Sequence, residues 1–200
     1  AINDVDIDDG SATIHWTSPD NNNLRVDLCY ALNSLSESDC LNNINGVTVV
    51  DNTYSGVRLT DLLNGQTYHA LLITSDGVSR VTSSQFTFYI PNFYSIEIKI
   101  RGQRGGTIQY NEETYSDGET IVLPELTEPD INNMYTFQIN PNSGNTISGI
   151  SGCQYGYLED RSSTNIGKYN VYMLTANCTI EVDFWKVHEQ RAGVPGETYN

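Results

Sequence analysis

Apolar and polar residues alternate in short runs along this chain, and helical periodicity is almost absent. The runs are separated by Gly, Asn, Asp and Ser, which favour turns. In the first run, Val5 and Ile7 alternate with aspartates. After a turn at residues 9–11, Ile14 and Trp16 alternate with polar residues. This pattern predicts a β-hairpin with one buried face, and its recurrence predicts an all-β protein.

More runs of the same kind follow in the first half. They lie at residues 24–32, 47–50, 57–59, 68–75 and 79–89. Roughly seven short strands in about 90 residues favour an antiparallel β-sandwich, because each strand has one face to bury and a second sheet supplies the cover.

Two segments of this half carry a family resemblance. Residues 14–19 read I-H-W-T-S-P, and residues 59–68 follow the pattern L-x-x-L-x-x-G-x-x-Y. With these motifs, residues 1–90 resemble a fibronectin type III domain, which is an immunoglobulin-like sandwich. The pair Cys29 and Cys40 departs from ordinary members of that family.

The second of these motifs implies a corner of the sandwich. Leu59 and Leu62 are expected to cap the core, and Gly65 to permit a tight turn. Tyr68 is expected to bury its ring while its hydroxyl bonds to backbone upstream.

A domain boundary is predicted near Pro91, because proline interrupts strand hydrogen bonding. We therefore expect a first domain at residues 1–90 and a second at residues 91–185. Residues 186–200 lose the apolar pattern and contain glycine and proline, which predicts a tail or linker.

Five short motifs follow one another in the second half. They are G-G-T-I at residues 105–108, D-G-E-T-I at 117–121, I-N-P-N-S-G at 139–144, S-G-C at 151–153 and T-A-N-C-T-I at 175–180. In this order they resemble a bacterial surface repeat module related to the internalin B-repeat, over about residues 95–184. The resemblance implies a small, mainly β domain of β-grasp type, in which variants with two cysteines at these positions pair them.

The four cysteines include no C-x-x-C pair, which disfavours zinc and thioredoxin-type sites. Of the three connectivities, the simplest pairs Cys29 with Cys40 and Cys153 with Cys178, one bridge per domain. Each bridge would contribute about 2–4 kcal/mol. Disulfides persist in a periplasm, on a cell surface or outside the cell, so secretion is expected. Four buried free thiols are the alternative.

The composition excludes several classes of protein. The 200 residues include 25 acidic and 10 basic ones, for a net charge of −15, so clustered basic residues for nucleic acid are lacking. No apolar run approaches the roughly 18 residues needed to span a membrane, and no signal peptide is recognisable. Because the chain begins at Ala1, we expect a processed protein or a fragment of a longer one.

Four aspartates between residues 4 and 9, followed by Gly10, suggest a calcium loop. The spacing does not fit, because the glycine is one position late and His15 stands where a bidentate glutamate belongs. The solvent side of a strand is the simpler interpretation.

Motifs typical of catalytic sites and of phosphate-binding loops are also absent from the sequence. His15, His69 and His188 have no H-x-x-H spacing, and there is no G-x-S-x-G segment. The glycines of residues 101–106 lack the G-K-[ST] ending of a phosphate loop. We therefore expect no catalytic residue, no metal site and no cofactor.

Tyrosines crowd the second half, and alternation would leave some of them exposed. Tyr155, Tyr157, Tyr169 and Tyr172 are candidates for a ligand-binding surface, since exposed aromatic rings stack on sugars or anchor proteins. Packing within the sheet is the alternative, because tyrosine favours strands.

These patterns predict a non-catalytic binding, adhesion or spacer segment of a secreted or surface-anchored bacterial protein. Its partner would be an extracellular protein or glycan, with no nucleic acid and no membrane span. The alternative is an accessory, substrate-targeting region of a secreted hydrolase whose catalytic domain lies outside these residues.

Overall fold

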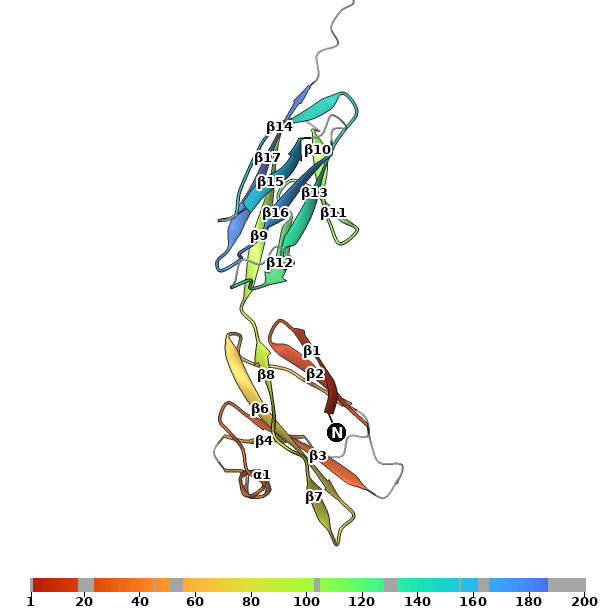
Figure 1. The fold of residues 1–200 in the computed structure, drawn as a ribbon, viewed down its shortest axis with the longest axis vertical. Helices are drawn as coiled ribbons and strands as arrows, with labels where there is room; N and C mark the ends of the chain where they lie inside the picture. The colour runs from red at the N-terminus through yellow and green to blue at the C-terminus, as the bar shows by residue number, and fades with distance from the viewer. Residues whose placement is uncertain are drawn as a thin grey trace, which may run out of the picture. The chain divides into compact units, whose positions relative to one another are not determined.

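The computed structural model of the chain consists of two compact units, Ala1–Asn92 and Phe93–Asn200 (Figure 1). The structure describes residues 2–17, 24–44, 46–50, 56–102, 105–127, 133–154, 156–161 and 166–186. Within these ranges the chain is β-structure apart from a single short helix, so the predicted all-β class is confirmed. Of the predicted tail, only Lys186 belongs to the described residues.

The first unit contains two antiparallel sheets. One has the order β1-β2-β5, with β1 at Ile2–Asp8, β2 at Ser11–Trp16 and β5 at Gly56–Leu59. The other has the order β4-β3-β6, with β4 at Thr48–Val50, β3 at Arg25–Ala31 and β6 at Gln66–Ser75. Two short strands, β7 at Arg80–Thr82 and β8 at Phe86–Ile90, both pair with β6. The single strand expected at residues 79–89 is thus interrupted at residues 83–85.

Side chains from both sheets form the core of the first unit. The fully or nearly buried members are Ala12, Ile14, Trp16, Val26, Leu28, Leu59, Leu62, Tyr68, Ala70, Leu72, Phe88 and Ile90. Ile14 and Trp16 belong to this core, as the alternation predicts. Ile7 lies on the same side of the hairpin as its register partner, the buried Ala12, but it is 37% exposed, so the predicted burial of this position is wrong. The alternating pattern continues to the end of the hairpin, but the second sheet does not cover the apolar side of the strand there.

The corner at Tyr68 has the expected geometry. Leu59 and Leu62 are buried, and Gly65 has a φ of 71°, which a side chain would disfavour. The Tyr68 ring is 5% exposed and stacks on Phe88 at 5.5 Å between centroids. Its hydroxyl accepts a hydrogen bond of 2.7 Å from the backbone N–H of Leu63.

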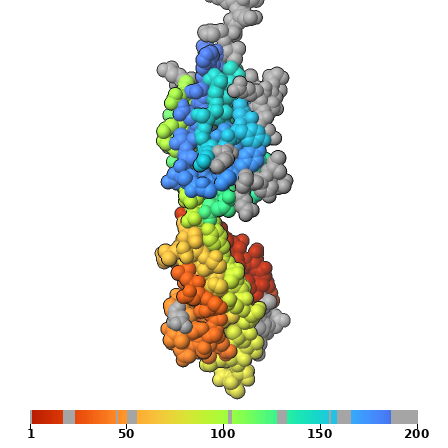
Figure 2. All heavy atoms as spheres, turned by 60° about the vertical axis from the view of Figure 1, so that its left-hand side comes forward, coloured from red at the N-terminus to blue at the C-terminus, as the bar shows by residue number. Residues whose placement is uncertain are grey.

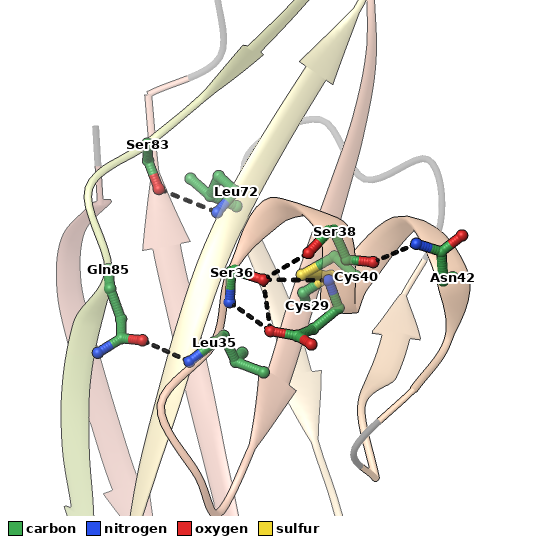
Figure 3. The surroundings of a disulfide bond; sticks show 10 residues. Cys29, Leu35, Ser36, Ser38, Cys40, Asn42, Leu72, Ser83 and Gln85 are labelled. Atoms are coloured by element: carbon green, nitrogen blue, oxygen red, sulfur yellow. Dashed lines mark hydrogen bonds between the residues drawn. A yellow bond between two sulfur atoms is a disulfide. The ribbon is translucent and has the colours of Figure 1, made fainter.

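Strand β6 is buried on both of its faces. Leu71 and Ile73 point away from the main core and pack with Cys29, Leu35 and Cys40 in a second apolar cluster. The cover comes from α1, a helix at Glu37–Asn42 that the alternation did not predict. Figure 3 shows this helix beside the disulfide, and the orange segment containing it forms part of the surface in Figure 2.

The second unit also contains two sheets. The five-stranded sheet has the order β11-β10-β13-β16-β15 and is antiparallel throughout. Its strands are β10 at Gly106–Tyr110, β11 at Glu113–Tyr115, β13 at Tyr135–Pro141, β15 at Gly156–Arg161 and β16 at Gly167–Val171. The four-stranded sheet has the order β12-β9-β17-β14. Its strands are β9 at Phe93–Arg101, β12 at Thr120–Pro124, β14 at Asn145–Ser151 and β17 at Cys178–Lys186.

The four-stranded sheet is mixed. Its central pair, β9 and β17, is parallel, and these are the first and last strands of the unit. Each central strand has an antiparallel neighbour on its outer side, β12 and β14. This is the strand order of a β-grasp sheet, and here a five-stranded sheet packs against it. Apolar residues of both sheets form one core that includes Ile98, Phe137 and Val182.

Candidate binding surface

The candidate tyrosines do not all reach the surface. Tyr157 is 43% exposed, and its ring stacks on that of Tyr172 at 5.1 Å with an angle of 3° between planes. Tyr169 is only 3% exposed and belongs to the core, so its place on a binding surface is wrong. Tyr155 lies outside the described residues.

Strand register explains this difference. Tyr157 is directly opposite Asn170, and Tyr172 follows Asn170 by two residues, so both rings lie on the outer side of the sheet. Tyr169 points to the other side, where its ring passes so close to Gly156 that a Cβ there would overlap it. Because Tyr169 directly precedes Asn170 in the strand, its side chain points to the opposite side of the sheet and lies in the core.

The outer side of the five-stranded sheet is built from amides and hydroxyls. Paired residues in register share a face, which places Gln109, Gln138 and Lys168 in one row and Thr136, Asn170 and Tyr157 in another. We call this side the amide face. Its described side chains are those of Thr107, Gln109, Thr114, Thr136, Gln138, Asn140, Tyr157, Lys168, Asn170 and Tyr172.

A chain of hydrogen bonds links four of these side chains across three strands. Gln138 Nε2 donates to Asn140 Oδ1 at 2.8 Å, and Asn140 Nδ2 donates to Gln109 Oε1 at 3.1 Å. Gln109 Nε2 then donates to Thr114 Oγ1 at 3.2 Å. Each amide in the chain thus has a fixed orientation.

A second connection lies under the tyrosine pair. The hydroxyl of Thr136 donates to Asn170 Oδ1 at 2.8 Å, and the Asn170 side chain is wholly shielded from solvent. A buried amide satisfied in this way is a rigid support for the rings beside it.

The outer side of the four-stranded sheet has a different chemistry. Lys99 Nζ lies 3.1 Å from Glu97 Oε2, and Arg101 pairs with Glu181. Asp183 adjoins them on β17, in register with Arg101 on β9. Ion pairs of this exposed kind are typical of a solvated face.

The first unit has a cleft of about 1000 Å³ on the outer side of β3, β6 and β7. Arg25, Ser75 and Arg80 form a cross-strand row along it. Arg25 Nε donates to Asp27 Oδ1 at 2.7 Å, and Asp76 also lines the cleft. Two arginines are therefore balanced by two carboxylates among the described residues that line the cleft.

Asp76 shapes one wall of this cleft. Its Oδ1 accepts hydrogen bonds from the backbone N–H groups of Ser79 at 2.6 Å and Val78 at 2.8 Å. These bonds hold the pKa of Asp76 below its ordinary value. The carboxylate thus closes the turn between β6 and β7.

Two smaller cavities were also found. One, of about 390 Å³, is lined by apolar residues such as Trp16 and Leu72 and by polar ones that include Thr74 and Asp76. The other, of about 300 Å³, lies beside Glu97 and Thr179 on the charged face. Neither brings together a pair of acid and base groups.

The described residues contain no cluster of three His, Cys, Asp or Glu that could hold a metal ion. The aspartates of β1 project outward, where Asp6 contacts His15 at 2.9 Å and Asp8 lies 3.6 Å from Arg58. His69 contacts Gln85 at 3.1 Å. His188 lies outside the described residues.

Both cysteine pairs are joined. Cys29 bonds to Cys40 and Cys153 to Cys178, with Cα atoms 5.9 and 5.1 Å apart, and no free cysteine remains among the residues described. No helix in the described part of the chain is long and apolar enough to cross a membrane.

The chain matches no protein-family model and no curated protein. A bacterial adhesin from Mobiluncus mulieris with intramolecular disulfide, isopeptide and ester bond cross-links is similar in structure at 9% identity and a TM-score of 0.29; the alignment covers 88% of this chain and 89% of the adhesin chain. Two structures of a mutant of Kfla1895, in complex with cyclobis-(1→6)-alpha-nigerosyl and with isomaltose, are similar at 10% identity and TM-scores of 0.33 and 0.31. Those alignments cover 90% of this chain but only 32% and 30% of the other chains.

The sequence reasoning missed the amides of the candidate surface. Gln109, Gln138 and Asn140 occupy the polar positions of the alternating strands β10 and β13. One feature of the sequence could have indicated them. The polar positions of β10 and β13 hold uncharged amides, whereas the polar positions of β9 and β17 hold charged residues. Only the register shows that they form one face.

Proposed function

We propose that this chain is a non-catalytic binding segment of a secreted or surface-anchored bacterial protein, with a fibronectin type III-like unit followed by a module like the internalin B-repeat. In this arrangement the first unit acts mainly as a spacer. The second unit contacts an extracellular partner.

Sheet order and the Tyr68 corner support the first family assignment. A sandwich of β1-β2-β5 against β4-β3-β6, with β8 beside β6, is an immunoglobulin-like arrangement. The mixed β12-β9-β17-β14 sheet supports the second assignment. The two disulfides fit an oxidising compartment, which supports export.

The observation that carries the binding function is the stacked pair Tyr157 and Tyr172 on the amide face. An exposed aromatic pair on a rigid sheet buries much area on contact and loses little side-chain entropy. Among the described side chains of the amide face, Lys168 is the only charged one. Such a site suits contact with a partner better than catalysis.

An array of extracellular-matrix proteins and glycans, probed with the intact chain, tests this function. We expect binding to at least one component and its loss in Tyr157→Ala/Tyr172→Ala. A matched control is Tyr89→Ala, which removes an exposed tyrosine of the first unit. Absence of any binding, or equal binding by the double variant, would contradict the proposal.

A further inference from the structure

We infer that the amide face binds a neutral oligosaccharide or polysaccharide. This inference rests on the proposed binding function and names the class of its ligand. Four observations lead to it: the charge of the face, its fixed amides, its aromatic pair and its open shape.

Charge is the first observation. The whole chain has a net charge of −15, yet among the described side chains of the amide face only Lys168 is charged. A polyanion would be repelled by the acidic molecule and would find no cluster of basic groups on this face. A basic ligand would find no carboxylate among the described side chains of this face. The complementary partner of the amide face is therefore uncharged and rich in hydrogen-bonding groups.

Sugar hydroxyls have the matching chemistry. Each hydroxyl both donates and accepts, and each amide offers two N–H donors and a carbonyl acceptor. In the chain from Gln138 to Thr114, every amide donates one N–H to a neighbouring side chain, and its second N–H has no acceptor among the described residues. Within the described residues Gln138 Oε1 accepts no hydrogen bond, so this end of the chain offers an acceptor.

The amides are also fixed before a ligand arrives. Gln109, Gln138 and Asn140 are half-buried and bonded to one another across β10 and β13. Free glutamines would lose rotamer entropy on binding, and here the fold has already restricted them. Such preorganisation raises affinity for a ligand that meets all three at once.

The aromatic pair supplies the apolar part of the contact. Tyr157 and Tyr172 stack in parallel, and a sugar ring can pack its C–H groups against an exposed aromatic face. The pair lies near β15 and β16, whereas the amide chain lies on β11, β10 and β13. Two interstrand spacings, about 10 Å, separate β15 from β13. One monosaccharide does not bridge this distance, so the ligand has several sugar units.

The shape of the amide face also favours a polymer as its ligand. The three cavities described above are lined by residues outside the amide face. An open sheet face accepts the side of an extended chain, whereas small ligands are usually enclosed in a pocket.

Affinity electrophoresis and titration calorimetry test the inference with the intact chain. The neutral probes are dextran, amylose, laminarin, galactomannan and xylan, and the anionic probes are heparin and hyaluronan. We expect binding to at least one neutral probe and an affinity that does not fall when salt is added, because no charge is neutralised. Gln109→Ala/Gln138→Ala should weaken this binding about tenfold or more, since two ligand hydrogen bonds are lost.

Three further variants separate ligand contact from folding. Thr120→Ala/Thr179→Ala changes hydroxyls on the charged face and should bind as the wild-type chain does. Tyr157→Phe keeps the ring and should retain binding, whereas Tyr157→Ala should lose it. Circular dichroism and thermal unfolding show whether each variant is folded.

Wild-type chain that binds none of the neutral probes, or binds only the anionic ones, would overturn the inference. Equal affinity of wild-type chain and a folded Gln109→Ala/Gln138→Ala variant would do the same. If the chain then binds a matrix protein through Tyr157, the proposed binding function stands and only the neutral-glycan ligand is wrong. If it binds nothing on the array, both proposals fail.

Discussion

Tyr68 and Tyr135 each bury part of an aromatic ring and give its hydroxyl a backbone partner. Tyr68 accepts from the N–H of Leu63, and Tyr135 donates to the carbonyl oxygen of Pro124 at 2.7 Å. The two bonds differ in direction, so deleting each hydroxyl has a different consequence. Loss of the first leaves a part-buried N–H without its acceptor, and loss of the second leaves a carbonyl without its donor.

Tyr68→Phe tests the first bond. We expect the free energy of unfolding of the first unit to fall by about 1–2 kcal/mol, because the Leu63 N–H keeps its desolvation cost without a partner. Chemical denaturation followed by fluorescence measures the change. The control is Tyr115→Phe, whose exposed hydroxyl donates to Glu113 and should matter less than about 0.5 kcal/mol. Equal effects of the two changes would contradict the importance of the corner bond.

Tyr135 also predicts a dependence on alkaline pH. Burial raises its pKa from the ordinary value of 10.0 to about 12. Since the folded pKa lies above the unfolded one, the stabilisation is fully present below pH 10.0 and is lost as pH rises toward about 12. Denaturation midpoints across this range should fall more steeply for the wild-type chain than for Tyr135→Phe. Parallel curves for the two proteins would show that Tyr135 does not contribute.

At the scale of the element, α1 shows what alternation cannot predict. Residues 36–39 read S-E-S-D, and the structure has a capping box in which Ser36 Oγ accepts from the Asp39 N–H while Asp39 accepts from the Ser36 N–H. The helix has only six residues, too few for a helical period to be visible. The continuous apolar run at residues 70–73 was the second available signal, because a strand buried on both faces needs cover on both.

Ser36→Ala should destabilise the first unit by about 1 kcal/mol, the usual cost of losing an N-cap. The helix contributes the buried Cys40 and covers the apolar cluster around Leu71, so its fraying exposes both. Urea denaturation gives the change, with Ser38→Ala as control because the Ser38 hydroxyl hydrogen-bonds to that of Ser36 and to no backbone N–H among the described residues. A null effect for Ser36→Ala would mean that the disulfide alone holds the helix in place.

Individual strands could be predicted where apolar and polar residues alternate without interruption, but the pairing of these strands into sheets could not. In β13, Phe137 and Ile139 alternate with Gln138 and Asn140, so the polar phase of the strand could be read directly. The amide face required the register of β10 with β13, a pairing between segments about 30 residues apart that carries no local signal. Tyr169 and Tyr172 are three residues apart, so alternation places them in opposite phase, but only the assembled sheets show that Tyr169 is the one in the core.

At the scale of the whole molecule, each unit has its own apolar core and its own disulfide. The core around Ile14 and Tyr68 belongs to the first unit, and the core around Ile98 and Phe137 belongs to the second. Cys29–Cys40 and Cys153–Cys178 follow the same division. Because each unit has its own core and its own disulfide, we expect each unit to unfold independently of the other.

Removal of one disulfide should therefore destabilise one unit only. Cys29→Ala/Cys40→Ala should lower the stability of the first unit, and Cys153→Ala/Cys178→Ala that of the second, each by about 2–4 kcal/mol. Hydrogen exchange measured by mass spectrometry assigns the loss of protection to strands of one unit or the other. The bridge at Cys29 closes a loop with a sequence separation of 11, and the bridge at Cys153 one of 25, so the chain-entropy term predicts the larger loss for the second pair. Loss of protection in both units from either double variant would show that the two units unfold as one.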